Sequence, residues 1–224
     1  MKSTNWLNSM LRAIRKAGEV VARVIADISM SLDGFVTGPE VNMENRLGIG
    51  GEALHTWAFS DDPEDQRQLS EGTAGSGAVV LGRRLFDIVD GLNGWNDEVG
   101  YGAGQVGKPP FIVVTSSRPT SVRLSALDWT FVTSGVADAV AVARERAEAT
   151  SLARGEDLDV VIMGGGATIG SAVAEGLVDS LVLHLAPVIL GAGTPLFGGG
   201  AARRLVQRAA VTTSTATHLT YDFD

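Results

Sequence analysis

The chain alternates between short apolar segments and segments whose apolar residues recur at helical spacing. The apolar segments are rich in Val and Ile, a composition typical of buried strands. We expect strands at residues 20–29, 78–81, 111–115, 129–133, 160–163 and 180–190. The longest expected helix covers residues 136–149, after an N-terminal cap at Ser134. Strands that alternate with helices predict an α/β fold with a mostly parallel sheet.

The last part of the chain departs from this alternation. Residues 205–211 and 216–223 have the pattern of two strands joined by a short turn, which predicts an antiparallel hairpin. Pro187 lies inside the segment 180–190 and indicates an edge or a bulge there. His184 lies in the same segment, and we expect a hydrogen-bonded structural residue there rather than a catalyst.

Residues 160–170 combine a strand, a glycine turn and the start of a helix. Gly164, Gly165 and Gly166 follow the strand directly, where the chain must turn and expose its N–H groups. Exposed amides at the positive end of a helix dipole suit a phosphate, although a plain tight turn explains the glycines as well. The dinucleotide fingerprint is not matched, because Ile169 stands where its third glycine belongs.

A second candidate anion site follows the strand at 78–81. Arg83 and Arg84 come directly after Gly82 at an expected helix start, and guanidinium groups pair well with phosphate oxygens. Cations at a helix N-terminus oppose the helix dipole, and this favours an anionic ligand over a merely solvated helix end. The end of the next strand adds hydroxyl groups for sugar or phosphate contacts, at Thr115, Ser116 and Ser117.

Three further residues are candidates for the substrate side. Asp33 follows the first strand, where α/β sheets bind their ligands, but a turn residue before Gly34 has the same pattern. His55 is a candidate acid–base group near neutral pH, with a half-exposed surface histidine as the alternative. Trp57 forms either an aromatic wall for a flat ligand or part of the core.

Composition narrows the classes of function. The chain has 224 residues, 45% of them hydrophobic, which suits one globular domain with a sizeable core. Its net charge of −8 and the lack of a basic stripe argue against nucleic acid as a partner. With no Cys and only 3 His, far apart in sequence, we expect neither a disulfide nor a metal site. No apolar run has transmembrane length, and we expect a cytoplasmic protein without an integral membrane segment.

Residues 1–19 differ from the rest, and we expect an amphipathic extension before a single domain at 20–224. Apolar residues from Trp6 to Ile14 share one helical face, and basic residues lie off it. Such a helix binds a membrane surface or a partner, or it docks on the domain or on a second subunit. We favour docking, because the segment is short and weakly cationic. Its apolar face and the long apolar segment at 180–190 favour a homodimer.

Five motifs occur in an order that resembles one family. They lie at 30–34 (Met-Ser-Leu-Asp-Gly), 82–84 (Gly-Arg-Arg), 114–116 (Val-Thr-Ser), 163–166 (Met-Gly-Gly-Gly) and 187–197, which begins Pro-Val-Ile-Leu-Gly. Together they resemble the dihydrofolate reductase-like family that includes the C-terminal reductase domain of the bacterial riboflavin biosynthesis deaminase-reductase. The resemblance spans nearly the whole chain. It implies a three-layer α/β/α fold with a mostly parallel central sheet and a C-terminal antiparallel hairpin.

The resemblance implies NADPH as the cofactor and assigns three groups of residues to it. The group that holds a cofactor phosphate at a helix start is Gly82, Arg83 and Arg84. The group beside the 2′-phosphate and the adenosine ribose is Thr115, Ser116 and Ser117. The group that receives the pyrophosphate is Gly164, Gly165, Gly166, Ala167 and Thr168.

The same resemblance places Asp33 beside the nicotinamide, facing the substrate. Reduction of a C=N or C=C bond needs a proton besides the hydride, and Asp33 is the acidic residue expected nearby. Its pKa must be raised by burial for this role, and water relayed through a hydroxyl is an alternative donor. His55 and Trp57 are expected to shape the substrate pocket.

Two departures from the family pattern bear on this expectation. Leu85 stands where the family often has Thr after its two basic residues, so one hydroxyl contact to phosphate is lost. The stretch at 39–77 is longer than usual and reshapes the substrate side. The leading hypothesis is an NADPH-dependent reductase of a small planar or conjugated molecule. A true dihydrofolate reductase and a nucleotide-binding sensor without turnover are the alternatives.

Overall fold

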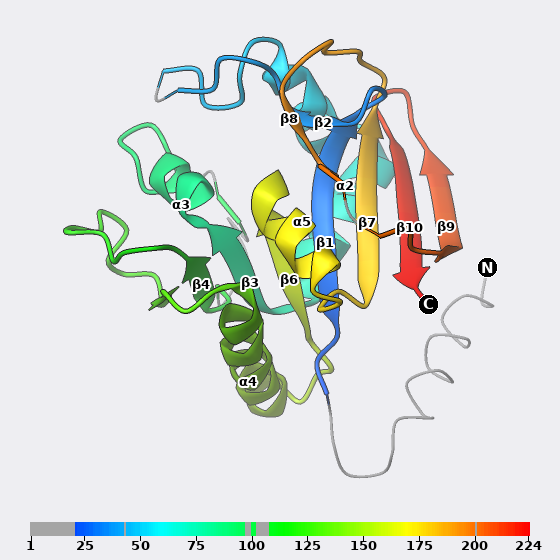
Figure 1. Ribbon diagram of the computed structural model, residues 1–224. Coiled ribbons are helices and arrows are strands. Elements are labelled where there is room, and N and C mark those ends of the chain that lie inside the picture. Colours follow the sequence, from blue (N-terminus) through cyan, green and yellow to red (C-terminus); the bar gives the residue numbers. More distant parts are fainter. Residues whose placement is uncertain (1–20, 43, 97–99, 102–107, 200) are drawn as a thin grey trace.

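The computed structural model describes residues 21–42, 44–96, 100–101, 108–199 and 201–224. Its main feature is an eight-stranded sheet with the order β5-β4-β3-β6-β1-β7-β10-β9 (Figure 1). A second, two-stranded sheet pairs β2 with β8. The strands are β1 (Val24–Ser31), β2 (Phe35–Thr37), β3 (Ser76–Gly82), β4 (Phe111–Val114), β5 (Trp129–Val132), β6 (Asp159–Gly164), β7 (Ser180–Ala186), β8 (Thr194–Pro195), β9 (Leu205–Thr212) and β10 (Thr217–Phe223).

The pairing confirms the predicted topology. Strands β5, β4, β3, β6, β1 and β7 are parallel to their neighbours. Strand β10 then runs antiparallel to β7 and to β9, which gives the expected C-terminal hairpin. The register between β7 and β10 places His218 directly opposite His184.

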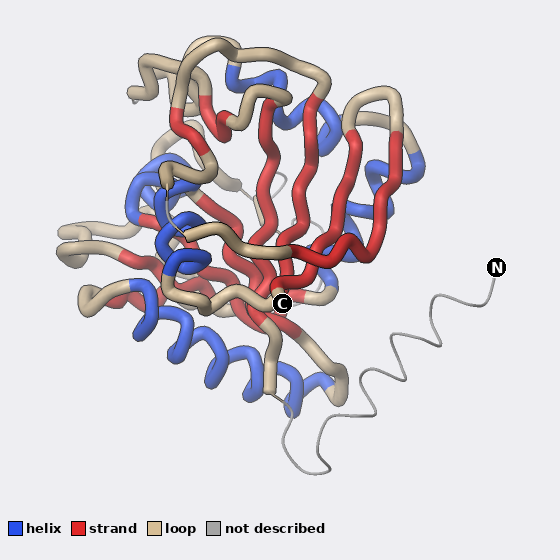
Figure 2. Tube along the Cα trace, turned by 45° about the vertical axis from the view of Figure 1, so that its right-hand side comes forward, coloured by secondary structure: helices blue, strands red, loops and turns tan. Residues whose placement is uncertain are grey.

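Helices cover both faces of the sheet, as Figure 2 shows. The helices are the 3₁₀ helix η1 (Gly51–Phe59), α2 (Pro63–Ala74), α3 (Arg83–Val89), α4 (Val136–Arg154) and α5 (Gly166–Ala174). Helices α4 and α5 pack over one face, where side chains such as Val80, Ile162 and Ala143 form the larger core cluster. Residues of α3 pack with Leu81 and Phe111 in a second cluster, and η1 contacts β1 and β7. The predicted three-layer α/β/α architecture is therefore confirmed.

A local capping signal agrees with the start of one helix. Helix α2 starts as an Asp-Pro pair suggests, with Asp62 as N-cap and Pro63 as its first residue. Two expectations were wrong. Strand β7 ends at Ala186, because Pro187 has no N–H to continue the ladder. The N-cap of α4 is Gly135, with φ of 114° and no side-chain cap, so Ser134 does not cap this helix.

Part of the sequence interpretation lies outside the described residues. The extension at 1–19 is among these segments, as is much of the glycine-rich stretch between 97 and 107. Among the residues that the structure does describe, no helix combines the length and the apolar character needed to cross a membrane.

Candidate functional site

The cofactor residues predicted from sequence meet at one edge of the sheet. Strands β4, β3 and β6 are parallel neighbours, so their carboxyl ends lie side by side. Thr115 follows β4, Gly82 ends β3 and Gly164 ends β6. We name the residues at these three strand ends the carboxyl-edge strip. Its members are Gly82, Arg83, Arg84, Thr115, Ser116, Ser117, Gly164, Gly165, Gly166, Ala167 and Thr168.

Arg83 ties two parts of the strip together. Its guanidinium donates to the carbonyl oxygen of Ser117 at 2.9 Å and approaches Thr115 Oγ1 at 3.4 Å. It also forms an ion pair with Asp87 at 2.8 Å. Arg84 is exposed and donates to the carbonyl oxygen of Val41 at 3.0 Å. Arg83 therefore joins the ends of β3 and β4, and Arg84 joins the start of α3 to the backbone at Val41.

Three positions of the strip favour glycine. A Cβ on Gly82 would lie 2.3 Å from Thr168 Oγ1, and a Cβ on Gly166 would lie 2.7 Å from Val36 Cγ2. Gly164 has φ of 132°, a backbone conformation that favours glycine. These contacts bring the start of α5 close to the end of β3.

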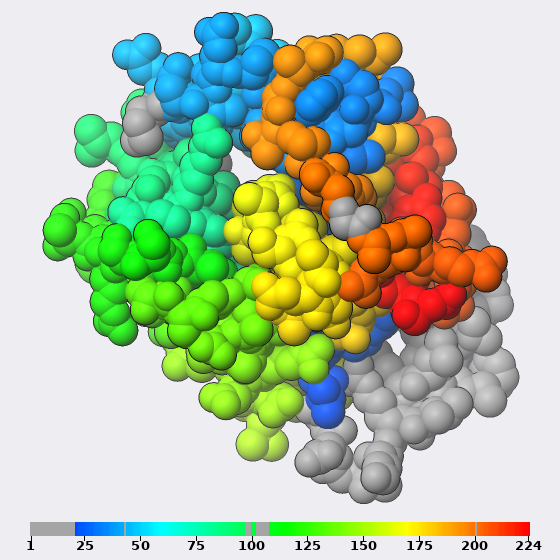
Figure 3. All heavy atoms as spheres, viewed as in Figure 1, coloured from blue at the N-terminus to red at the C-terminus, as the bar shows by residue number. Residues whose placement is uncertain are grey.

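The start of α5 is open toward solvent. Its N-cap, Gly165, is exposed, has no side-chain cap and has no atoms within 4 Å of an added Cβ. Thr168 and Ile169 donate the first helical hydrogen bonds to the carbonyl oxygen of Gly165, so the N–H groups before them have no partner within the helix. Figure 3 shows this face of the molecule hollowed between α3, α5 and the blue segment above them. Backbone amides, two guanidiniums and hydroxyls around a hollow fit the phosphates of a dinucleotide.

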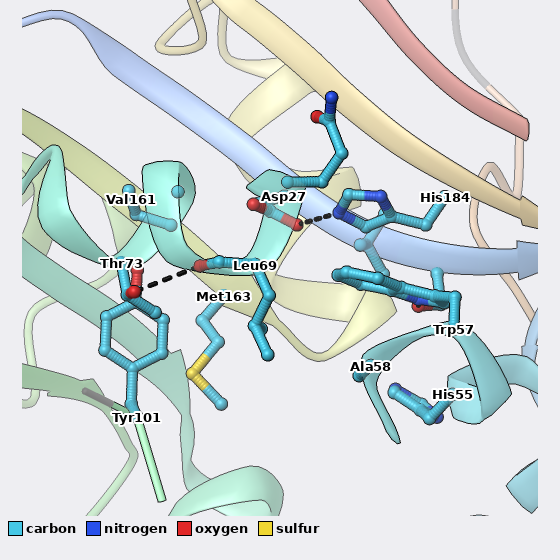
Figure 4. A pocket seen from close by; sticks show the side chains of 14 residues that line it. Asp27, His55, Trp57, Ala58, Leu69, Thr73, Tyr101, Val161, Met163 and His184 are labelled. Carbon is cyan, nitrogen blue, oxygen red and sulfur yellow. Dashed lines mark hydrogen bonds and ion pairs between the residues drawn. The ribbon is translucent and has the colours of Figure 1, made fainter. Parts of the chain in front are cut away.

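A cavity of about 190 Å³ lies next to the strip. Met163 of β6 lines this cavity, and the next residue, Gly164, belongs to the strip. The lining residues are Asp27, Ile28, Ser29, His55, Trp57, Ala58, Gln68, Leu69, Gly72, Thr73, Tyr101, Val161, Met163 and His184. Half of them come from the lengthened stretch at 39–77, which therefore forms one wall of the cavity (Figure 4).

A line of four hydrogen-bonding side chains runs from this cavity into the interior. Asp27 Oδ1 lies 2.9 Å from His184 Nε2, and His184 Nδ1 lies 2.7 Å from His218 Nδ1. His218 Nε2 in turn lies 2.8 Å from Asp65 Oδ1. Figure 4 shows Asp27 pointing toward His184 at the cavity. We name these four residues the histidine relay.

Burial differs along the histidine relay. The side chains of His184 and His218 are each 3% exposed and that of Asp65 is 0% exposed, whereas that of Asp27 is 29% exposed. Trp57 covers His184 with ring centroids 3.9 Å apart, and its Nε1 donates to Ser29 Oγ at 2.9 Å. Asp27 is therefore the end of the relay that a ligand can reach.

Several pKa values near the cavity are shifted. Burial opposes ionisation of Asp65, but hydrogen bonds from Thr215 and His218 outweigh it and lower the pKa of Asp65 to about 2. Burial lowers the pKa of His55, and the charge of His184 lowers it further. Burial also raises the pKa of Tyr101, although a hydrogen bond with Ser76 acts against this. Asp65 is thus a fixed anion, and Tyr101 keeps its proton at neutral pH.

Asp33 does not have the environment that the sequence interpretation required. Its carboxylate is exposed and accepts hydrogen bonds from the N–H groups of Leu190 at 3.1 Å and Gly191 at 2.7 Å. Hydrogen bonds from Ser31 and from these two amides lower the pKa of Asp33. The expected burial with a raised pKa is therefore wrong. Asp33 instead joins the loop after β1 to the backbone of Leu190 and Gly191.

The other two substrate-side residues do line the cavity, but with different surroundings. His55 Nδ1 is buried and has no hydrogen-bond partner in the part of the chain that the structure describes. Trp57 is a buried cover of the relay rather than an open wall. His184 is hydrogen-bonded, as expected, but it joins the cavity to the interior.

Leu85 occupies the place of the missing hydroxyl. Its side chain packs in the cluster with Phe86 and Val89, and an added Cβ on Gly164 would lie 3.5 Å from Leu85 Cδ2. Leu85 thus supports the turn after β6 through apolar contact.

Sequence reasoning missed Asp27, Asp65 and His218 as site residues. Asp27 is the one charged residue of strand β1, and a charge inside a predicted strand is a signal that could have been used. Asp65 looks like an ordinary first-turn acid of α2, and only its complete burial distinguishes it. Nothing local pairs His184 with His218, because they come from different strands.

Comparison with solved structures supports the same fold. A protein from Shewanella sp. PV-4 assigned to riboflavin biosynthesis is 20% identical, with a TM-score of 0.65, over 90% of this chain and 99% of that chain. The riboflavin biosynthesis reductase Rib7 of Saccharomyces cerevisiae is 12% identical, with a TM-score of 0.58, over 97% of this chain and 99% of the other. Dihydrofolate reductase from Enterococcus faecalis, complexed with NADP(H), is 15% identical, with a TM-score of 0.50, over 90% and 96% of the two chains.

Comparison of the sequence itself gave two results. No curated protein matches the chain. The family model described as the RibD C-terminal domain matches residues 22–220, nearly the whole chain. The motif order, the sheet topology and this match agree, and the chain belongs to the RibD C-terminal domain family, with a dihydrofolate reductase-like fold.

Proposed function

We propose that the protein is an NADPH-dependent reductase of a small planar or conjugated molecule with a C=N or C=C bond. The observation that carries the proposal is that the carboxyl-edge strip adjoins the cavity that Asp27 and His184 line. Consecutive residues of β6 belong to the two sites, Met163 to the cavity and Gly164 to the strip. A dinucleotide held along the strip would have its reactive end near the cavity.

The residues of the strip suit the cofactor's anionic groups. The N–H groups at the start of α5 and the guanidinium of Arg83 would hold phosphates, and Ser116 and Ser117 are exposed hydroxyls beside Arg83. When bound, NADPH supplies a hydride. The protein's share of the reaction is to orient the substrate, exclude water and provide a proton.

The size of the cavity favours a small substrate. An apolar cavity of about 150 Å³ accommodates benzene, so the volume of about 190 Å³ suits a molecule with one or two rings or a short conjugated chain. A folate is too long for this cavity, and most of the molecule would lie outside it. This supports a small heterocycle, imine or enone over dihydrofolate.

A binding and turnover experiment tests the proposal. NADPH fluorescence should change on mixing with the protein and should saturate. NADPH oxidation should then be measured with cyclic imines, small enones and dihydrofolate. The proposal predicts oxidation with an imine or an enone and little with dihydrofolate. Absence of NADPH binding at high concentration would refute it. Binding without turnover across the panel would favour the sensor hypothesis.

A further inference from the structure

We propose that the histidine relay, Asp27–His184–His218–Asp65, stores one transferable proton and delivers it through the carboxyl group of Asp27 to the nitrogen of a C=N substrate in the cavity. The identity of the acceptor rests on the proposed reductase function. The stored proton does not, because it follows from the side-chain contacts of the protein alone. Asp27 and His184 border the cavity, and His218 and Asp65 extend the line into the interior.

The number of contacts fixes the number of protons. Three contacts join the four side chains, and each places two heteroatoms 2.7–2.9 Å apart. At that separation one atom must carry a proton toward the other, since two lone pairs would repel. Three bridging protons are therefore needed to satisfy the whole line.

Neutral histidines cannot meet this requirement. Two carboxylates and two neutral imidazoles carry only two protons on the four ring nitrogens, one on each ring. One contact would then bring two unprotonated atoms together, in a region where His184, His218 and Asp65 are buried. A third proton satisfies every contact and leaves two carboxylates and one imidazolium, a net charge of −1.

The third proton can move without breaking the line. In one arrangement His184 is the imidazolium and donates to both Asp27 and His218. When the proton on His184 Nε2 shifts to Asp27 Oδ1, the carboxyl group donates back to His184 and all three contacts remain bridged. Since χ2 of Asp is a broad, two-fold torsion, a half turn of the carboxyl group then presents the O–H bond to the cavity. The contact between Asp27 and His184 stays without a bridging proton until a solvent proton returns.

The surroundings hold the inner end of the relay fixed. The Asp65 carboxylate also accepts a hydrogen bond from Thr215 Oγ1, so this end stays ionised and keeps a proton on His218 Nε2. Other titratable groups lie nearby: His55 of η1 and Tyr101 line the same cavity as Asp27 and His184, and Glu64 precedes Asp65 in the first turn of α2. Only the Asp27 end borders the cavity, so the proton leaves there.

The reduction adds one hydride and one proton to the C=N bond. NADPH, when bound along the carboxyl-edge strip, would supply the hydride, with its two electrons, that the carbon of the C=N bond accepts. The O–H bond of Asp27 breaks as an N–H bond forms at the substrate nitrogen, which yields the amine. Asp27 is left as a carboxylate, and a solvent proton that enters through the cavity restores the third bridging proton.

The experiment counts protons on histidine nitrogens in the protein without cofactor. The chain has only 3 His, so ¹⁵N-histidine labelling and the single variant H55Q assign the imidazole signals. Near neutral pH, three of the four ring nitrogens of His184 and His218 should be protonated, and their protons should exchange slowly. A count of two with Asp27 ionised, as the ¹³C shift of its carboxyl group reports, overturns the stored proton. A count of two with Asp27 protonated supports it, because the third bridging proton then lies on Asp27. A count of four overturns it as well, because the contact between the two Nδ1 atoms would then be broken.

The variant Asp27→Asn tests whether the third proton depends on the carboxyl group of Asp27. An Asn amide can donate to His184 Nε2, so the third proton is no longer needed and the count should fall from three to two. Asp138→Asn, on the exposed face of α4, is the matched control and should keep three. Three protons in D27N would overturn the role of Asp27. If D27N does not fold, the count in the unsubstituted protein alone decides. NADPH fluorescence on the same samples shows separately whether the reductase proposal fails.

Discussion

The carboxyl-edge strip and the histidine relay are neighbouring sites built in opposite ways. The strip consists of backbone amides, glycines and exposed polar side chains at three adjacent strand ends. The relay consists of four side chains, three of them buried, from β1, α2, β7 and β10. A site built from backbone at strand ends is suited to a ligand that many proteins share. A site built from distant side chains is suited to one particular chemical step.

Kinetic measurements should distinguish the roles of the two sites most clearly. Asp27→Asn should lower turnover by roughly 10²–10⁴-fold, the usual contribution of a general acid, and leave NADPH affinity unchanged. The pH dependence of turnover should flatten as well, because the proton no longer comes from the protein. Steady-state kinetics with the substrate found in the panel, alongside fluorescence titration of NADPH, measures both. An equal loss of affinity and turnover would mean that the two sites are not separable.

Removal of one imidazole should destabilise the fold through the relay. His218→Phe leaves Asp65 and His184 without their shared partner, and breaking a buried charged pair costs about 3–5 kcal/mol. His55→Phe is the matched control, since it removes an imidazole outside the relay. Urea unfolding of the three proteins compares their free energies of unfolding. Similar losses in both variants would show that the relay adds no special stability.

Substitutions in the carboxyl-edge strip should affect the affinity for NADPH more than turnover. Replacing Arg83 and Arg84 together by Ala removes two cations at the end of β3, and hydrogen bonds to charged groups contribute about 1.5–3 kcal/mol. We expect NADPH affinity to fall by roughly 10–100-fold, with a smaller effect on NADH and little effect on turnover at saturating cofactor. Arg146→Ala, on α4, is the control. An unchanged preference for NADPH over NADH would place the 2′-phosphate elsewhere.

Acid should lower the free energy of unfolding through the histidine relay, because the relay contains the ionised carboxylate of Asp65. The pKa of Asp65 is lowered from 3.8 to about 2, so its carboxylate adds stability that is complete above about pH 4. This stability disappears as the pH falls toward 2, and by linkage it amounts to about 2 kcal/mol. In Asp65→Asn the free energy of unfolding should therefore depend less on pH between 4 and 2. Parallel pH profiles for the two proteins would contradict this assignment.

The smallest effect is expected at Asp33, the residue favoured from sequence. Its carboxylate is exposed and bonded to the N–H groups of Leu190 and Gly191. Asp33→Asn keeps a side-chain oxygen for this turn, so turnover should change by less than the effect of Asp27→Asn, and the melting temperature should fall slightly. A loss of turnover as large as that of D27N would restore Asp33 as the proton donor.

The fold and the positions of the strip could be predicted from local sequence patterns. Strand–glycine–helix motifs involve only neighbouring residues. The turns at Gly82 and Gly164 could therefore be predicted without information on the rest of the chain. The parallel alternation then placed the ends of β3, β4 and β6 on one edge. Even the hydrogen-bonded state of His184 followed from its place in an apolar strand, although its partners did not.

The histidine relay could not be predicted in this way, because it depends on contacts between distant parts of the chain. Residues 27, 65, 184 and 218 are separated by long stretches of sequence, and their meeting depends on the antiparallel register of β10 against β7 and on the packing of η1 and α2. In the structure Asp33 is exposed, whereas Asp65 is completely buried. Periodicity reports which face of an element is apolar. It carries no information on which two polar side chains will meet across strands, because that contact is set by the three-dimensional register of the whole sheet.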